Sequence, residues 1–458
     1  MRRRLPGLVG MLTLIVVYWA QRVQVLQAFA WRFTDEDQAL LAYVVREIQA
    51  GTPHAPTFYG QSYGNWIEAA VAAPFTPASV SPAVTLPVAT QWLCWLPFVA
   101  LALQEWRRGA TGLSLTLLLI PCLLPHRADV LYSMPRAWLP GITVAMLGAT
   151  LLRPFPMAMA ASQMVGVTLN SAAGLLSIPV LVEAGMRGRR DRQLLQRLAA
   201  GVVLGALYPA ALWMFDLQHP TYAIHPSPPW TWSPARMREG LSQANLLAGS
   251  LLPLTCALLA LAVGVGRVTR SSLVALAVFA GLCLAAPGFE KVWDAQLSVF
   301  FPHERAFLAL PYAGTWWLWL SLQDRAVTPS PPGPRRAMLV AAGLLVALTL
   351  TRKEATRAEA LQVEIGRRMP SVVMPREVRS VQRTCDEAEA LASRAGAPWV
   401  IFRQDRTAAY ACGADWYGRR ETLFPSYERR QWLFTRVDAR QVIVFEEGSR
   451  HSEKVSGQ

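Results

Sequence analysis

The sequence predicts an all-α domain that crosses a membrane about eleven times, followed by a small soluble α/β domain. Composition is the first observation, because hydrophobic residue types make up 53% of the chain and charged types only 16%. Soluble domains carry roughly a quarter charged residues. The second observation is that the long apolar runs lie in residues 1–351, whereas residues 352–458 mix charged, aromatic and small side chains. We therefore expect a transmembrane domain over 1–351 and a soluble domain over 352–458.

The apolar runs predict the individual spans, since a helix needs about 20 mostly apolar residues to cross a bilayer. The first run follows Met1-Arg2-Arg3-Arg4 and is not closed by a small-residue cleavage site, so we interpret it as an uncleaved first span. The two runs on either side of Asn170 are either two short spans or one long span. The predicted spans are 6–28, 86–104, 110–125, 137–152, 155–169, 172–186, 197–215, 245–266, 271–286, 305–322 and 336–351.

Arginine placement predicts the orientation of the spans. Short connections on one side hold most of the arginines, which is typical of cytoplasmic loops. Because the arginines cluster in this way, the net charge of +14 is explained by membrane topology, and we expect no nucleic-acid partner. This arginine bias places the N-terminus in the cytoplasm, and an odd number of spans then places the C-terminal domain in the periplasm. We therefore expect a multi-pass protein of a bacterial inner membrane. Long loops in a compact protein are usually functional. The predicted external segments are 29–85, 126–136, 216–244 and 287–304.

The C-terminal region reads as a charged helical run over 352–391 with strands at 399–402 and 441–445, which indicates a small α/β domain. A proline-rich segment at 329–334 predicts a stiff linker before it. Cys385 and Cys412 form a disulfide if this domain faces an oxidising compartment, and stay free thiols if it is cytosolic.

Three carboxylates, Asp35, Glu36 and Asp37, come directly after the first span. Carboxylates at this place are costly unless they are solvated, paired or used. One interpretation is structural: Thr34 or Asp35 caps a helix over 37–50, whose apolar residues fall on one side and predict that it lies along the membrane surface. The other interpretation is catalytic, and both can hold together.

Asp35 and Asp37 also form a D-x-D pattern, which makes a bound divalent cation possible. A lone D-x-D is a weak signal because hard cations usually take more oxygen ligands. The histidines fit no ligand spacing. No cofactor is firmly predicted, and no metal ligand is assigned.

The next stretch of the first external segment carries a family resemblance. Residues 58–69 read F-Y-G-Q-S-Y-G-N-W-I-E-A, after an acidic pair and a helix that ends in glycine. This order resembles the GT-C superfamily of bacterial membrane glycosyltransferases, which includes the protein O-mannosyltransferase and aminoarabinose transferase families and the RgtA/B/C/D-like group. Residues 301–311 are similar to the entry into a late span of that superfamily, with Ala306 and Phe307 replacing its usual tyrosine. The resemblance covers roughly residues 1–351 as an order of elements, and the C-terminal domain is not assigned.

The resemblance implies an inverting glycosyltransferase that takes a sugar from a polyprenyl-phosphate donor in the lipid bilayer. An acid in the first external loop of these enzymes removes the proton of the acceptor hydroxyl. By position that base is Asp35, with Glu36 or Asp37 as the alternative. The acceptor is a glycan, a lipid or a protein.

The substrate-binding residues follow from the same resemblance and from the need for cations at a phosphate. Arg305, with His303 and Glu304, resembles the contact to the lipid phosphate, and Arg136 assists it. A surface salt bridge is the structural alternative for Arg136 and Asp129. The predicted set is Tyr59, Gln61, Tyr63, Glu68, Asp129, Arg136, His303, Glu304 and Arg305.

Two other functions remain open at this point. A transporter or flippase for a lipid or small solute would show repeats and polar groups at mid-membrane. Here no repeat is visible and the ionisable residues lie mostly outside the spans. A relative that binds a lipid-linked sugar without catalysis is the third interpretation, and the presence of Asp35 disfavours it.

Overall fold

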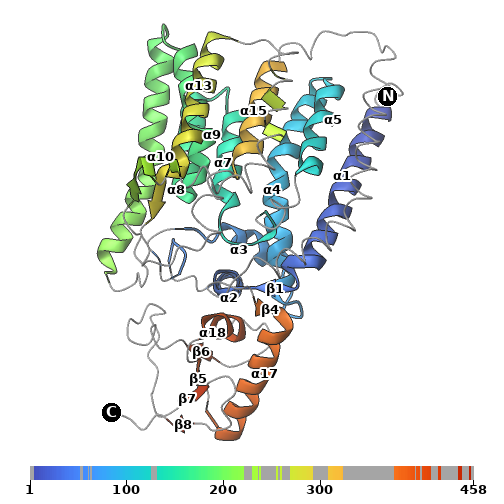
Figure 1. Cartoon of the computed structure of the whole chain (residues 1–458), viewed down its shortest axis with the longest axis vertical. Helices are drawn as coiled ribbons and strands as arrows, with labels where there is room; N and C mark the ends of the chain where they lie inside the picture. The colour runs from blue at the N-terminus through green and yellow to red at the C-terminus, as the bar shows by residue number, and fades with distance from the viewer. Residues whose placement is uncertain are drawn as a thin grey trace.

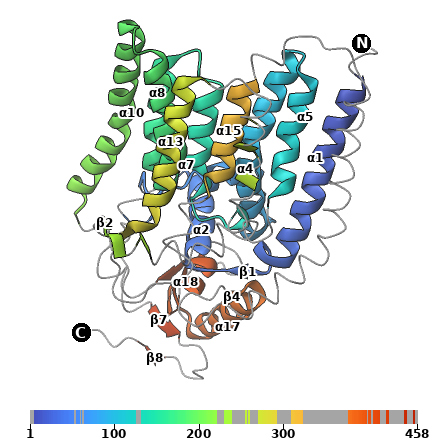
Figure 2. The ribbon, with the colours of Figure 1, turned by 45° about the horizontal axis from the view of Figure 1, so that its top comes forward.

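The computed structural model shows a bundle of long helices with a small α/β domain attached at one end (Figure 1). The N-terminal end of the first helix lies at the opposite end of the bundle (Figures 1 and 2). The residues that the structure describes are 5–51, 55–59, 61, 64–124, 132–220, 230–235, 237–238, 254–255, 258–259, 262, 269–291, 308–322, 376–397, 399–402, 405–413, 421–423, 442–445 and 453–454.

Most of the described helices form the bundle, and others lie at the end that carries the α/β domain (Figure 1). The first helix, α1 (Leu5–Val25), continues as a π-helical turn, η2 (Leu26–Ala30). The other bundle elements are α4 (Pro82–Arg107), α5 (Thr111–Leu119), η4 (Ile120–Leu123), α7 (Leu139–Thr150), α8 (Pro156–Leu169), η5 (Ser171–Ala173), α9 (Gly174–Arg187), α10 (Arg192–Gln218), α13 (Arg270–Ala285), η7 (Ala286–Gly288) and α15 (Leu310–Leu322). The helical elements near the α/β domain are α2 (Glu36–Ala50), α3 (Ile67–Ala72) and η3 (Ala73–Phe75).

The helices have the length and composition of membrane spans. Among the described residues, three are long and apolar enough to cross a bilayer, at Leu5–Ala30, Pro82–Arg107 and Arg192–Gln218, and shorter apolar helices accompany them. Large apolar side chains are exposed on α10, as at Leu207 and Trp213, where lipid is the expected solvent. The predicted multi-pass membrane protein is confirmed. The spans predicted at 245–266 and 336–351 fall mostly or wholly outside the described residues, so the number eleven stays a prediction.

Asn170 separates two helices, α8 and α9, which answers the question that the sequence left open. Its side-chain oxygen accepts a hydrogen bond from the backbone N–H of Ala172 at 2.8 Å and caps the short turn η5. The two apolar runs therefore form two separate helices and not one long helix, and whether each crosses the membrane stays a prediction.

Glycines bring the bundle helices into backbone contact. A Cβ atom on Gly141 of α7 would lie 2.5 Å from the carbonyl oxygen of Gly166 on α8. On the next helix, Gly201 and Gly205 of α10 form a G-x-x-x-G pair whose added Cβ atoms would meet carbonyl oxygens of α8. Small residues at this spacing let helices approach closely in a membrane, where apolar burial between helices gives little driving force.

The C-terminal domain is the predicted α/β unit. Its sheet has the order β6-β5-β7-β8, in which β5 runs parallel to β6 and β7, and β8 is antiparallel to β7. The predicted strands at 399–402 and 441–445 are β5 and β7. The linker at 329–334 and residues 352–375 of the predicted helical run lie outside the described residues. The elements are α17 (Val378–Ala395), β5 (Trp399–Phe402), α18 (Arg406–Gly413), β6 (Glu421–Leu423), β7 (Val442–Phe445) and β8 (Glu453–Lys454).

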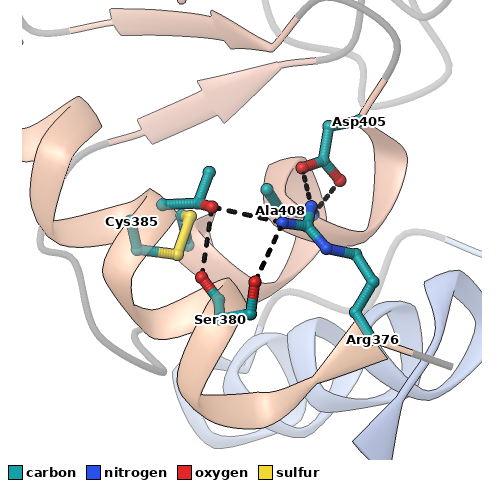
Figure 3. Close-up of a disulfide and its surroundings, with 7 residues drawn as sticks. Arg376, Ser380, Cys385, Asp405 and Ala408 are labelled. Carbon is teal, nitrogen blue, oxygen red and sulfur yellow. Dashed lines mark hydrogen bonds and ion pairs between the residues drawn. A yellow bond between two sulfur atoms is a disulfide. The ribbon is translucent and has the colours of Figure 1, made fainter. Parts of the chain in front are cut away.

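A disulfide joins the two helices of this domain. Cys385 of α17 is bonded to Cys412 of α18, with 5.4 Å between their Cα atoms (Figure 3). Of the two states considered from the sequence, the structure has the bonded one. A disulfide of this kind is typical of an oxidising compartment.

A short strand pair attaches the domain to the bundle. Strand β1 (Phe33–Thr34) follows the first helix and pairs antiparallel with β4 (Arg376–Glu377), with Thr34 opposite Arg376. A second pair, β2 (Trp230–Trp232) with β3 (Phe289–Lys291), joins the segments predicted as external at 216–244 and 287–304. The first loop and the C-terminal domain therefore lie at the same end of the bundle, as the predicted threading requires.

Helix α2 lies between the bundle and the C-terminal domain (Figure 1), and its predicted place along the membrane surface stays a prediction. Its apolar side chains, including Leu41, Val44 and Val45, are buried in a cluster shared with α17, α18 and the start of α4. The amphipathic pattern gave the buried face correctly. It could not show that another part of the chain, and not lipid, covers that face.

Candidate functional site

Asp35 forms the first residue of the candidate site and caps α2. Its backbone is extended, and its Oδ1 accepts a hydrogen bond from the backbone N–H of Gln38 at 3.0 Å. The residue is 3% exposed. The predicted cap is thus confirmed for Asp35, and the helix begins at Glu36, one residue before the predicted start. Capping uses one carboxylate oxygen and leaves Oδ2 for another partner.

Arg136 is the partner of Asp35, from a loop 101 residues away in the sequence. Its Nη2 donates to Asp35 Oδ2, and both side chains are 3% exposed. Its Nη1 lies 3.4 Å from Asp37 Oδ2, and its guanidinium carbon lies 5.5 Å from the ring centre of Trp138. Tertiary structure therefore joins two predicted site residues, the acid of the first loop and the arginine of the second, in a buried ion pair. Removing one partner of such a pair strands a charge in the interior.

Glu68 fixes the backbone next to Arg136. The residue is fully buried on α3, and its Oε2 accepts a hydrogen bond from the backbone N–H of Ala137 at 2.8 Å. Burial raises the pKa of Glu68 to about 8, although the Ala137 N–H and the Thr90 hydroxyl both lower it. At neutral pH the side chain is therefore mostly the uncharged acid. Glu68 thus holds Ala137, the residue next to Arg136, and its predicted contact with substrate stays a prediction.

Asn65 holds the same loop from its other side. Its Nδ2 donates to the carbonyl oxygens of Ala137 at 3.2 Å and Leu169 at 3.3 Å, and its Oδ1 accepts from the N–H of Ile67 at 3.1 Å. Ala137 needs this support because its φ is +61°, a left-handed conformation that is uncommon for alanine. Sequence reasoning missed both residues. Asn65 stood in an amide-rich stretch that pointed to it, whereas nothing in the sequence marks Ala137.

Tyr59 and Gln61 shape the first loop. Tyr59 is 2% exposed and packs in the apolar cluster that contains the buried face of α2. The N–H of Gln61 donates to the carbonyl oxygen of Phe58, and its carbonyl oxygen accepts from the Thr57 hydroxyl, both at 3.0 Å. These contacts give the two residues a role in the loop conformation, and their predicted contact with substrate stays a prediction.

Glu36, an alternative to Asp35 as the base, lies in the first turn of α2 and is partly exposed. The remaining predicted residues lie outside the part of the chain that the structure describes. Their distances to Asp35 stay predictions, including that of the arginine expected to hold the lipid phosphate. They are Tyr63, Asp129, His303, Glu304 and Arg305.

The two carboxylates of the D-x-D pair face an arginine in this arrangement. Arg136 contacts both Asp35 and Asp37, so a guanidinium already provides the positive charge between them. Within the described ranges, no group of three or more His, Cys, Asp or Glu residues gathers at one place. Hard cations take six or more oxygen ligands, which these two carboxylates do not supply.

A small cavity lies beside Asp35. Its walls come from four parts of the chain: Thr34 and Gln38 around the cap, Pro87 on α4, Pro135 next to Arg136, and Val378 of the C-terminal domain. Gln38 is 4% exposed, and its Nε2 has no hydrogen-bond partner among the described residues.

These features define a class of protein: a multi-pass membrane protein with a buried acid–arginine pair where the helical bundle meets an extramembrane domain. Among solved structures, the chain is similar to ArnT from Cupriavidus metallidurans in the apo state, with a TM-score of 0.53 and 13% sequence identity. The match covers 93% of this chain and 86% of that chain. The predicted fold class, a helical membrane domain with a small C-terminal α/β domain, is thereby confirmed, and at this identity the likeness to ArnT shows the fold alone. No family model and no curated protein sequence matches the chain.

Proposed function

We propose that this protein is an inverting membrane glycosyltransferase that moves a sugar from a polyprenyl-phosphate donor to an acceptor at the external, periplasmic face. The observation that carries the proposal is the Asp35–Arg136 pair, buried at the junction of the bundle and the C-terminal domain. ArnT, whose fold the chain shares, is an aminoarabinose transferase of the GT-C superfamily. That likeness supports a lipid-linked donor.

The reaction needs a base at the acceptor hydroxyl. In the proposed step, Asp35 takes the hydroxyl proton while the acceptor oxygen forms a bond to the anomeric carbon of the sugar. The bond between that carbon and the phosphate oxygen breaks on the opposite face, and its electron pair leaves with the polyprenyl phosphate. Protonation and bond exchange then balance without a redox partner. A carboxylate fixed by a cap can serve because geometry is the first requirement for a general base.

Arg136 gives this site a way to respond to the donor. In the structure, Arg136 neutralises Asp35 and Asp37 together. A donor phosphate would compete for the same guanidinium, because phosphate is a strong bidentate partner for arginine. Movement of Arg136 toward phosphate would free Asp35 Oδ2 for the acceptor proton. The base would then become available only when the donor is bound.

The test compares three matched carboxylate variants of the full-length protein: Asp35→Asn, Glu36→Gln and Asp37→Asn. Purified protein is incubated with a panel of polyprenyl phosphates that carry radiolabelled sugars, together with an envelope lipid and glycan extract as acceptor. We expect label to move to the acceptor with wild-type protein, and Asp37→Asn should lose less transfer than Asp35→Asn because Asp37 accepts no proton in the proposed step. Transfer by Asp35→Asn should fall by at least about 100-fold, as for loss of a general base.

The variants also separate the alternatives. Full transfer by Asp35→Asn together with loss in Glu36→Gln would make Glu36 the base. Equal label with boiled protein for every donor would remove the transferase proposal, and labelled lipid crossing vesicles without transfer would support the transporter alternative. Circular dichroism on each variant shows that the fold is retained.

A further inference from the structure

Helix α18 of the C-terminal domain packs directly on α2, the helix that Asp35 caps. Its buried residues Ala408, Ala411 and Cys412 belong to the same apolar cluster as Leu41 and Val45 of α2. Helices α2 and α18 lie side by side in both ribbon views (Figures 1 and 2). The position of α2 therefore depends on where the C-terminal domain holds α18.

Arg376 fixes the first end of α18. Its guanidinium pairs with Asp405, whose Oδ1 also accepts the backbone N–H of Ala408 at 2.9 Å and so caps that helix. A second nitrogen of Arg376 lies 3.3 Å from the Thr384 hydroxyl on α17. Arg376 and Asp405 are 23% and 15% exposed at their side chains, so water weakens the pair only partly.

The backbone of Arg376 is at the same time bound to the strand before Asp35. Arg376 lies opposite Thr34 in the β1–β4 pair, and the N–H of Val378 donates to the carbonyl oxygen of Arg32 at 2.8 Å. Arg376 thus makes two connections. Its backbone pairs with strand β1, which leads into the cap of α2, and its side chain holds the start of α18, which packs on α2.

The disulfide fixes the second end of α18. Cys412 lies in its last turn and is bonded to Cys385 in the middle of α17. Because α18 is only 8 residues long, attachment at both ends leaves it little freedom to move against α17. The domain therefore presents α18 to α2 as a rigid surface.

We propose that Arg376 is a positioning residue for the candidate base: it fixes strand β1 and helix α18 relative to each other, and α2 with its cap Asp35 is held between them. In this arrangement Arg376 links the extramembrane domain to the helix that carries the candidate base. Its effect on catalysis rests on the proposed transferase function, whereas its effect on α2 does not.

The structural test uses hydrogen exchange on the full-length protein in detergent. Arg376→Ala removes the pair with Asp405, and we expect exchange in the peptide 33–50 to become about tenfold faster, as for loss of one charge-assisted hydrogen bond. Arg379→Ala is the matched control, because Arg379 is exposed on α17 and its loss changes the charge equally. Exchange over 33–50 that stays at the wild-type rate in Arg376→Ala overturns the proposal.

An activity measurement adds the catalytic part. With a donor that the wild-type protein uses, Arg376→Ala should lower kcat about tenfold with a smaller change of KM, and Arg376→Lys should restore part of it by keeping the charge near Asp405. A kcat of Arg376→Ala equal to that of Arg379→Ala overturns the positioning role in catalysis. If wild-type protein transfers no sugar while exchange over 33–50 still responds, the transferase proposal fails and the positioning of α2 stands.

Discussion

Glu68 makes the stability of this protein depend on pH in a way that one substitution removes. The side chain is fully buried and bonded to the N–H of Ala137, and burial raises its pKa to about 8. Glu68→Gln keeps an oxygen that accepts the same hydrogen bond, but it has no proton to lose. The variant therefore separates the buried acid from its hydrogen bond.

The sign and size of the effect follow from the two pKa values. The folded protein holds the Glu68 proton up to a pKa of about 8, whereas the unfolded chain releases it near the ordinary pKa of 4.5. The stabilisation is therefore fully present below about pH 4.5 and is lost as pH rises to about 8. Each pKa unit corresponds to about 1.4 kcal/mol, so the loss across that window is about 5 kcal/mol.

The assay is the midpoint of thermal unfolding in detergent between pH 5 and pH 9, for wild-type protein and Glu68→Gln. We expect the wild-type midpoint to fall by several degrees relative to the variant as pH rises, because all other titrating groups are common to both proteins. Glu387→Gln, an exposed substitution on α17, should run parallel to wild type. Parallel curves for wild type and Glu68→Gln would refute the reasoning, since they would mean that Glu68 titrates normally in the folded state.

Three further perturbations test the packing around the site, each by thermal unfolding. Gly205→Leu should lower stability by about 1–3 kcal/mol because its side chain would meet the α8 backbone, whereas Gly281→Leu faces open space and should change little. Replacing Cys385 and Cys412 together by serine should lower the stability of the C-terminal domain by about 3–4 kcal/mol, as the loop entropy for a separation of 27 residues requires, and reductant should then have no further effect. Asn65→Ala should lower stability by about 1–3 kcal/mol by leaving two buried carbonyl oxygens without their donor, and an unchanged midpoint would contradict the role given to Asn65.

Local patterns in the sequence predicted several elements closely. The strand at 399–402 and the helix that follows Asp35 appear almost where the side-chain pattern placed them. Side-chain alternation, capping residues and apolar runs act over a few residues, so they can be read without knowing the fold. The number of spans depends on segments outside the described residues and stays a prediction.

Two residues predicted for the candidate site, Asp35 and Arg136, form an ion pair in the structure. The sequence predicts them as a base and a phosphate contact, which stay predictions, and no local pattern indicates that they pair. Glu68 was chosen for a family motif, whereas the structure buries it against Ala137. Contacts between residues far apart in the chain carry no local signal, which is why Asn65 and Ala137 were not recognised together.

By itself the sequence determined that this is a multi-pass membrane protein with a C-terminal α/β domain and an acidic turn after its first span. These properties follow from composition and short-range periodicity, which can be read directly from the sequence. Only the tertiary structure decided that Arg136 neutralises Asp35, that Glu68 lies in the interior, and that α18 covers α2. The physical reason is that burial and charge pairing depend on which distant segments of the chain come into contact. The packing of the bundle determines those contacts because it brings loops from separate helices to one end.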